Sequence, residues 1–201
     1  DIIKKKLKEI AYLNKNLKLI YYNEAENEER TYQEEHGIQS FVSYINRDAT
    51  PIHDTPIYIE GTSGDIEVEI AFQYTTNYSE QINPYCNRIN VADGGTLVTG
   101  FKTALTRVMN QYARELGVLK DKDENFDGKD IRNGIVAIIS IKHPDPQFEG
   151  QTKQKLGNSE ARAAVDSIVS EQLTYFLEQN PAVAKVMCEK SILAQDRKSV
   201  V

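Results

Sequence analysis

Hydrophobic side chains recur at helical spacing in several parts of the chain. The clearest run is 101–116, where the apolar residues fall in a stripe about 100° wide when the chain is wound at 3.6 residues per turn. The same spacing predicts a helix that ends near residue 13, a short helix over 38–45 and a longer helix over 159–179. Residues 182–201 have the pattern of a further helix that is cut short.

Other segments have the pattern of β-strands. Residues 66–74 alternate strictly between apolar and polar side chains, so one face should pack and the other should meet water. Residues 57–60 and 85–91 are further strand candidates, and the second of these ends at the turn 93–95. The nearly continuous β-branched run 135–141 predicts a central strand that is covered on both sides.

The order of these elements predicts the fold class. Near the N-terminus, 17–22 resembles a strand and the acidic run 23–30 an exposed turn, as in a hairpin. The full order is then helix, strand, short helix, three strands, helix, strand, loop and two helices. This order predicts an α+β or α/β sandwich, with helices on one face of a mixed sheet. A chain of 201 residues with 40% apolar content is long enough for one such domain.

The composition excludes several classes of protein. No run approaches the roughly 18 apolar residues of a membrane span, so no membrane partner is expected. The chain begins at Asp1 without a signal sequence, and we expect a fragment of a cytoplasmic protein. Cys86 and Cys188 are far apart and indicate neither a disulfide framework nor a zinc site. The formal net charge of −6 argues against tight binding of nucleic acid over the whole surface, so any contact with DNA should be local or transient.

The polar loop between the expected central strand and the helix over 159–179 is the most informative stretch. Proteins of mixed α and β structure often present ligand-binding residues at such a place. Lys153 is a flexible cation suited to a terminal phosphate, and Gln151 can donate through its amide. The backbone amides of 158–161, at the start of the helix, could support an anion. The alternative is a mobile, solvated surface loop.

Three blocks of the sequence resemble the B subunits of bacterial type IIA DNA topoisomerases. The loop that carries the Gln-Thr-Lys motif in this family is similar to residues 144–158, PDPQFEGQTKQKLGN. A strand, a Gly-Gly-Thr turn and a helix of the same domain are similar to 89–96 and 100–107. The segment that joins this domain to the preceding ATPase domain is similar to 10–15. The blocks follow the order of the family over nearly the whole chain.

The resemblance implies a part of an ATP-dependent enzyme that is catalytically silent by itself. In this family a separate N-terminal domain, of the type shared with MutL, heat-shock ATPases and histidine kinases, holds the ATP, and the full-length enzyme uses Mg. The transducer domain reaches across with its loop, which makes Lys153 the catalytic contact of the γ-phosphate, with Gln151 beside it. Lys153 would lose this partner after hydrolysis and so report the nucleotide state. The role of Lys155 is not fixed by the resemblance, and a plain surface position is an equal alternative.

The resemblance also implies a fold and a division of the chain. The expected fold is a two-layer sandwich like domain 2 of ribosomal protein S5, with a mixed four-stranded sheet, helices on one face and further terminal helices. Residues 1–15 would be a connector helix from the ATPase domain, which this sequence lacks. Residues 16–180 would form the transducer domain, and 181–201 a truncated C-terminal helix.

DNA is implied as a transient partner. Two transducer domains in the B-subunit homodimer enclose a cavity for a DNA duplex, and the A subunit supplies the tyrosine that cleaves DNA. Lys102 matches a basic residue that faces this cavity. Arg107 and Arg114 are weaker candidates, because exposed charges on the far side of an amphipathic helix explain them equally well. Relatives commonly have His where this chain has Leu97, which puts any polar contact from that turn in doubt.

The leading hypothesis is a gyrase B transducer that couples hydrolysis to strand passage and negative supercoiling. Several alternatives stay open. The sequence does not separate gyrase from topoisomerase IV, because the element that distinguishes them lies in the A subunit. A transducer of the MutL or heat-shock type shares the fold, but it is not expected to carry both Gln-Thr-Lys and Gly-Gly-Thr. A free-standing S5-like module that binds nucleic acid or protein is disfavoured by the acidic balance and the absence of Trp.

Overall fold

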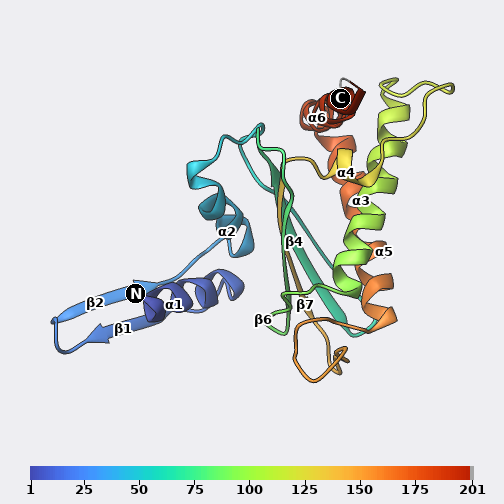
Figure 1. Ribbon diagram of the computed structural model, residues 1–201. Helices are drawn as coiled ribbons and strands as arrows, with labels where there is room; N and C mark the ends of the chain where they lie inside the picture. Colours follow the sequence, from blue (N-terminus) through green and yellow to red (C-terminus); the bar gives the residue numbers. More distant parts are fainter. Residues whose placement is uncertain (200–201) are drawn as a thin grey trace.

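The computed structural model describes residues 1–199 and contains a mixed five-stranded sheet (Figure 1). The strand order across the sheet is β3-β4-β7-β5-β6, in which β5 and β7 are parallel and the other neighbours are antiparallel. The bounds are β3 Ile57–Ser63, β4 Ile66–Tyr74, β5 Gln81–Cys86, β6 Ile89–Asn90 and β7 Ile135–Lys142. The β-branched strand β7 is therefore in the middle of the sheet, as its sequence predicts.

Two long helices cover one face of this sheet and form the main core with it (Figure 1). They are α3, Thr96–Glu115, and α5, Ser159–Gln179. The helices approach closely at Gly100, because a Cβ atom there would lie 2.6 Å from the carbonyl oxygen of Arg162. The short helix α4, Gly128–Ile131, and the last helix α6, Pro181–Ser199, pack against each other at one end of this layer. The last two residues of the expected C-terminal helix lie outside the described part of the chain.

A smaller cluster covers part of the opposite face. Helix α2, Ile38–Ile45, packs there on buried residues of β4 and β7, together with Leu13 at the end of α1, Ile2–Leu13. The second half of β4 is therefore buried on both faces, whereas its first half keeps Glu67 exposed. The expectation that one whole face of 66–74 meets water is wrong, because α2 shields half of it.

The N-terminal hairpin is separate from the main sheet. Strands β1, Leu19–Asn23, and β2, Glu28–Tyr32, pair antiparallel and extend away from the sandwich beside α1 (Figure 1). Lys4 of α1 donates to Glu28 at 2.8 Å, which ties the helix to the second strand. Part of the acidic run expected as a turn is thus a strand. A single 3₁₀ turn, Asn46–Asp48, follows α2.

The α+β class is confirmed, and the differences from the expected elements are local. Residues 85–91 do not form one strand, because Asn87 and Arg88 adopt positive φ values of 50° and 66° and reverse the chain between β5 and β6. The sheet consequently has five strands where four were expected. Strand β3 continues to Ser63, beyond the end of the expected strand 57–60. Helix α4 was not expected; its start is capped by the side chain of Asp127, which accepts from the backbone N–H of Asp130 at 3.0 Å.

Candidate functional site

The loop 144–158 connects β7 to α5 and forms two arms with an exposed tip. The backbone N–H of Gly157 donates to the carbonyl of Gln147 at 2.7 Å, and that of Glu149 donates to the carbonyl of Lys155 at 2.8 Å. Phe148 and Leu156 face each other as an antiparallel bridge between these bonds. These contacts align the arms, so the tip at 150–154 projects from a fixed base.

One arm of the loop is fastened to the turn that precedes α3. Leu156 donates to the carbonyl of Gly94 at 3.0 Å and accepts from the N–H of Thr96 at 3.0 Å. The N–H of Asp93 donates to the carbonyl of Gln154 at 2.7 Å, closer to the tip. The side chain of Leu156 is fully buried in the main core. The Gly-Gly-Thr turn and the Gln-Thr-Lys loop, which are far apart in the sequence, therefore form one structural unit.

The motif residues lie at the exposed tip of the loop. Gln151, Thr152 and Lys153 are all exposed. Within residues 1–199, no hydrogen bond or ion pair involves the side chain of Lys153. Lys155, two positions further on, pairs instead with Glu149 at 3.1 Å between Nζ and Oε2. The structure thus distinguishes the two lysines, because Lys155 has a carboxylate partner on the opposite arm and Lys153 presents its ammonium group to solvent.

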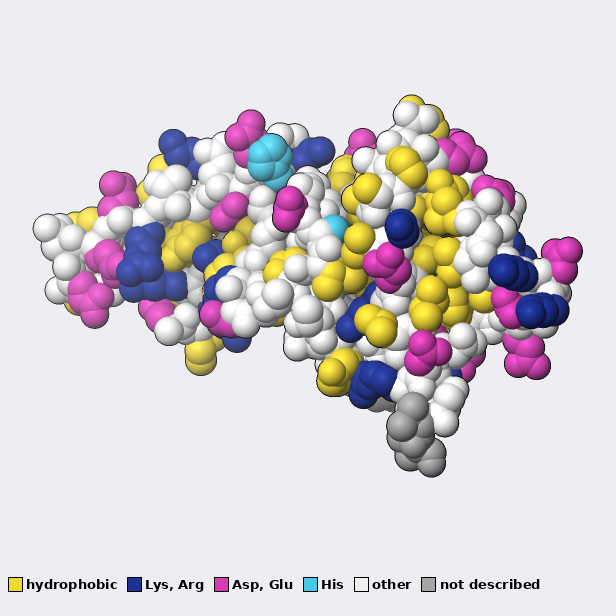
Figure 2. Space-filling model, turned by 90° about the horizontal axis from the view of Figure 1, so that it is seen from above, with side chains coloured by type: hydrophobic (Ala, Val, Ile, Leu, Met, Phe, Trp, Pro, Cys, Tyr) yellow, Lys and Arg dark blue, Asp and Glu magenta, His cyan; other side chains and the backbone are white. Residues whose placement is uncertain are grey.

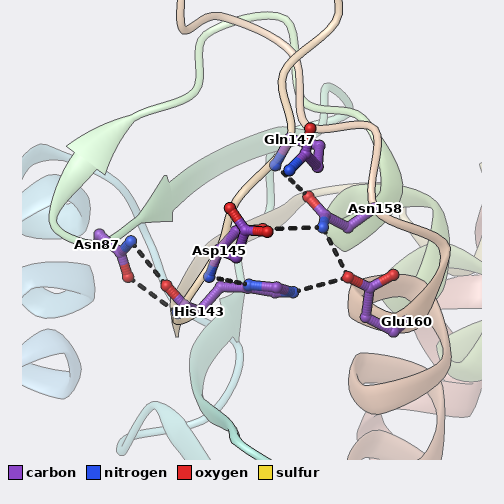
Figure 3. A network of polar contacts seen from close by, with 6 residues as sticks. All are labelled: Asn87, His143, Asp145, Gln147, Asn158 and Glu160. Carbon is purple, nitrogen blue, oxygen red and sulfur yellow. Dashed lines mark hydrogen bonds and ion pairs between the residues drawn. The ribbon is translucent and has the colours of Figure 1, made fainter.

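A network of hydrogen bonds fixes the base of the loop (Figure 3). The side chain of Asn87 accepts from the backbone N–H of His143 at 2.9 Å and donates to its carbonyl at 2.9 Å. The Nδ1 atom of His143 accepts from the backbone N–H of Asp145 at 2.9 Å. Nδ1 is thus the acceptor, so the ring proton is on Nε2, which is 3.0 Å from Oε1 of Glu160.

Asn158 completes this network from the other side. Its Oδ1 accepts from the backbone N–H of Gln147 at 2.6 Å, and its Nδ2 donates to Glu160 at 2.6 Å and to the carbonyl of Asp145 at 3.2 Å. The hydrogen bond from Asn158, together with the backbone N–H of Glu160 and with His143, lowers the pKa of the Glu160 carboxyl group. Asn158 occupies the N-cap position of α5, but its side chain makes no capping bond to that helix.

The three basic residues expected near DNA lie along one side of α3. Lys102, Arg107 and Arg114 line the same open hollow, of about 750 Å³. Lys102 is 3.8 Å from a carboxylate oxygen of Glu80. The guanidinium group of Arg107 binds both carboxylate oxygens of Asp166, at 2.6 and 3.2 Å, which links α3 to α5.

Arg114 has a structural role on the same hollow. Its guanidinium group donates to the carbonyls of Lys120 and Asp123, both at 2.9 Å, and to Oδ1 of Asn125. It therefore closes the loop that follows α3. Of the three candidates, Lys102 has the weakest attachment within the fold. Figure 2 shows the molecule from above the view of Figure 1, and on this face Lys and Arg side chains are interspersed with Asp and Glu.

Leu97 belongs to the core. It is fully buried in the first turn of α3 and packs in the main cluster. The side chain at this position therefore fills the interior and offers no polar contact from the turn. No helix in the described residues has both the length and the apolar character needed to cross a membrane. Within residues 1–199, no group of three or more His, Cys, Asp or Glu side chains could hold a metal ion.

The sequence did not indicate the base of the loop. Asn87 is 56 residues from His143, so only the fold brings them together. The position of His143 directly after a buried strand is the one available signal. By contrast, Gln151 and Lys153 are close in the sequence and lie together at an exposed tip.

Comparisons with known proteins agree with these features. A family model described as DNA gyrase B matches residues 37–200. The B subunit of DNA gyrase from Bacillus mycoides is 46% identical over 195 residues, which cover 96% of this chain and 48% of that protein. The B subunit of DNA topoisomerase 4 from Staphylococcus epidermidis is 50% identical over 199 residues, which cover 97% of this chain and 30% of that protein.

Solved structures have the same fold. The 43K ATPase domain of Thermus thermophilus gyrase B, in complex with an aminocoumarin, superposes with a TM-score of 0.92 at 38% identity, over 99% of this chain and 54% of that one. The chain spans about half or less of the length of the curated relatives it matches. With a family model that covers most of its length, the chain belongs to the DNA gyrase B family.

Proposed function

We propose that this chain is the transducer region of the B subunit of a bacterial type IIA topoisomerase. In this proposal the loop 144–158 delivers Lys153 to the γ-phosphate of ATP that is held by a separate domain. The observation that carries the proposal is the solvent-facing ammonium group of Lys153 at the tip of a loop whose base is firmly anchored. A cation held in this way can meet a phosphate without a large rearrangement of its support.

The chemistry of the tip suits a terminal phosphate. The ammonium group of Lys153 would compensate charge that develops on the transferred phosphoryl group, and the amide of Gln151 would add a neutral donor. ATP is the substrate in this proposal. Mg, which neutralises charge between the β- and γ-phosphates in such reactions, is expected with the nucleotide in the other domain, and no residue of this chain is assigned to it.

The loop is also placed to transmit a displacement. Through Leu156 it is bonded to the turn at Gly94, which leads into α3, and through Asn158 it joins α5. The two helices approach closely at Gly100, so they would move as one layer. Loss of the γ-phosphate would release Lys153 and shift this layer, which couples hydrolysis to the opening of a gate for DNA.

The partners follow from this role. They are a second copy of the B subunit, the A subunit that cleaves DNA, and a DNA duplex that passes transiently along the hollow beside α3. Lys102 is the residue on that hollow with the most freedom to contact a phosphate, since Arg107 and Arg114 are bonded within the fold. We favour gyrase, with negative supercoiling as the outcome, and topoisomerase IV is the alternative because the identities to the two kinds of relative are similar.

The experiment that tests the proposal compares two lysines of the same loop in the full-length protein. Lys153→Ala should leave ATP binding measurable but lower the steady-state rate of hydrolysis by about 100-fold or more, as for the loss of one donor at a developing charge. Lys155→Ala is the matched control and should keep most of the activity, because Lys155 contacts Glu149. An unchanged turnover in Lys153→Ala, or an equal loss in both variants, would contradict the proposal.

A further inference from the structure

Asn158 occupies the capping position of α5 but does not use its side chain as a cap. Asn at this position usually accepts a hydrogen bond from the backbone N–H two or three residues later, which stabilises the helix by about 1 kcal/mol. Here the side chain turns away from the helix and into the base of the loop (Figure 3). The helix gives up a common source of stability, which indicates that the side chain has another task.

That task is to join the two sides of the loop at its base. Oδ1 of Asn158 holds the backbone N–H of Gln147 on the incoming side, and Nδ2 holds the carbonyl of Asp145 on the same side. Asn158 itself begins the outgoing side, and only 5% of its surface is exposed. The amide therefore acts as a buried clamp directly below the arms that support the tip.

The remaining donor of the clamp is fixed by a charged partner. Nδ2 of Asn158 also donates to Oε1 of Glu160, the same oxygen that faces Nε2 of His143. His143 is in turn held at its backbone by both polar atoms of the Asn87 side chain. The orientation of the Asn158 amide is thus set from the sheet as well as from α5, and the amide cannot rotate without breaking several bonds.

We propose that Asn158 is a positioning residue, which with His143 and Glu160 holds the base of the loop so that Lys153 is presented at the correct height and direction. The inference rests on the proposed function of Lys153. Asn158 does not contact the nucleotide itself. It acts through the loop arms, where a shift of about 1 Å at the base is enough to reduce the rate strongly.

The key experiment measures turnover and ATP affinity of the full-length protein. Asn158→Ala leaves the Gln147 N–H without its acceptor, and we expect kcat to fall about tenfold or more while KM for ATP stays nearly constant. The matched control is Asn180→Ala at the opposite end of α5, where the one side-chain hydrogen bond within the described residues goes to the carbonyl of Phe176. This control should leave kcat unchanged.

A charge swap tests the mechanism with variants that keep the shape of the site. Asn158→Asp keeps the acceptor for Gln147 but puts a carboxylate against Glu160, so activity should fall. The double variant N158D/E160Q exchanges the donor and the acceptor of this pair but still leaves the Asp145 carbonyl without its donor, so it should recover part of the kcat lost in Asn158→Asp. If the swap fails to restore activity in a protein with normal thermal stability, the clamp is not the cause of the loss.

Two further readouts separate this inference from the function proposed for Lys153. In a Lys153→Ala background, Asn158→Ala should cause no further loss of kcat, and an equal loss in both backgrounds would overturn the positioning role. Hydrogen exchange at the Glu149 and Gly157 amides should become faster in Asn158→Ala, and unchanged exchange would also overturn it. If Lys153→Ala keeps full activity, the proposed function fails, while the exchange result still reports whether Asn158 holds the loop.

Discussion

A Cβ atom on Gly95 would lie 2.1 Å from the carbonyl oxygen of Leu156, well inside the contact distance of any side chain. The backbone of Gly95 also has a φ of 106°, a conformation that residues with a Cβ rarely adopt. Both constraints arise because the loop and the turn before α3 approach as neighbouring backbone segments. Glycine is required here by contact as well as by conformation.

Gly95→Ala should therefore destabilise the fold and displace the loop. The backbone conformation alone costs about 1–3 kcal/mol in the free energy of unfolding, and the contact with Leu156 adds to it. Gly64→Ala is the control, because Gly64 has a φ of 59° but, apart from its two chain neighbours, no atom of residues 1–199 lies within 4 Å of the added Cβ. Its loss should be about 1–2 kcal/mol, the cost of the left-handed conformation alone. Urea denaturation of the 201-residue chain measures both, and equal losses would contradict the importance of the Leu156 contact.

His53 predicts a dependence of stability on pH. Its Nδ1 is 3.0 Å from the carbonyl of Thr55, to which it donates, and its Nε2 accepts from the backbone N–H of Tyr74 at 2.9 Å. The ring is therefore neutral, and burial lowers its pKa below the ordinary value of 6.5. Protonation would place a second N–H against that of Tyr74 and break the bond.

The sign of the effect follows from this lowered pKa. The unfolded chain takes up a proton near pH 6.5 and the folded chain only at lower pH, so the contribution is complete above about pH 6.5 and is lost as the pH falls below it. A series of denaturation curves between pH 7.5 and 5 should show a smaller decrease in His53→Gln than in the original chain. Parallel profiles for the two proteins would show that His53 is not the source.

Local sequence patterns were sufficient for the elements that build the sandwich. Helices α3 and α5 follow a long apolar pattern of helical period, whereas strand β7 was indicated by its continuous β-branched run and short length. The reversal between β5 and β6 was not predictable in the same way. It uses Asn87 and Arg88 at positive φ, without the glycine that usually marks such a turn.

The candidate site also has one part that the sequence could indicate and one part that it could not. The tip with Gln151 and Lys153 is local in sequence, and a motif can identify it; the family match also removes the alternative of a MutL-type or heat-shock-type transducer. The support of the tip is not local. The clamp at Asn158 depends on Asn87, His143 and Glu160, the first two of which are brought near it only by the fold. Because Asn is common at helix starts as a cap, its presence there gave no sign that the side-chain amide bonds to the loop instead.

The basic residues of α3 give a final prediction, which concerns DNA bound by the full-length protein. If Lys102 contacts a phosphate, Lys102→Ala should lower the slope of log K against log salt concentration by about 0.9, the value for one lost phosphate contact. Arg107→Ala is the control, since the Arg107 guanidinium group is bound by Asp166 and the variant should change this slope little. Titrations of a short duplex at several salt concentrations measure both slopes. A larger change for Arg107→Ala than for Lys102→Ala would contradict this prediction. It would mean that the ion pair between Arg107 and Asp166 opens on DNA binding, so that the contacts of these side chains in the free protein do not decide which of them binds the duplex.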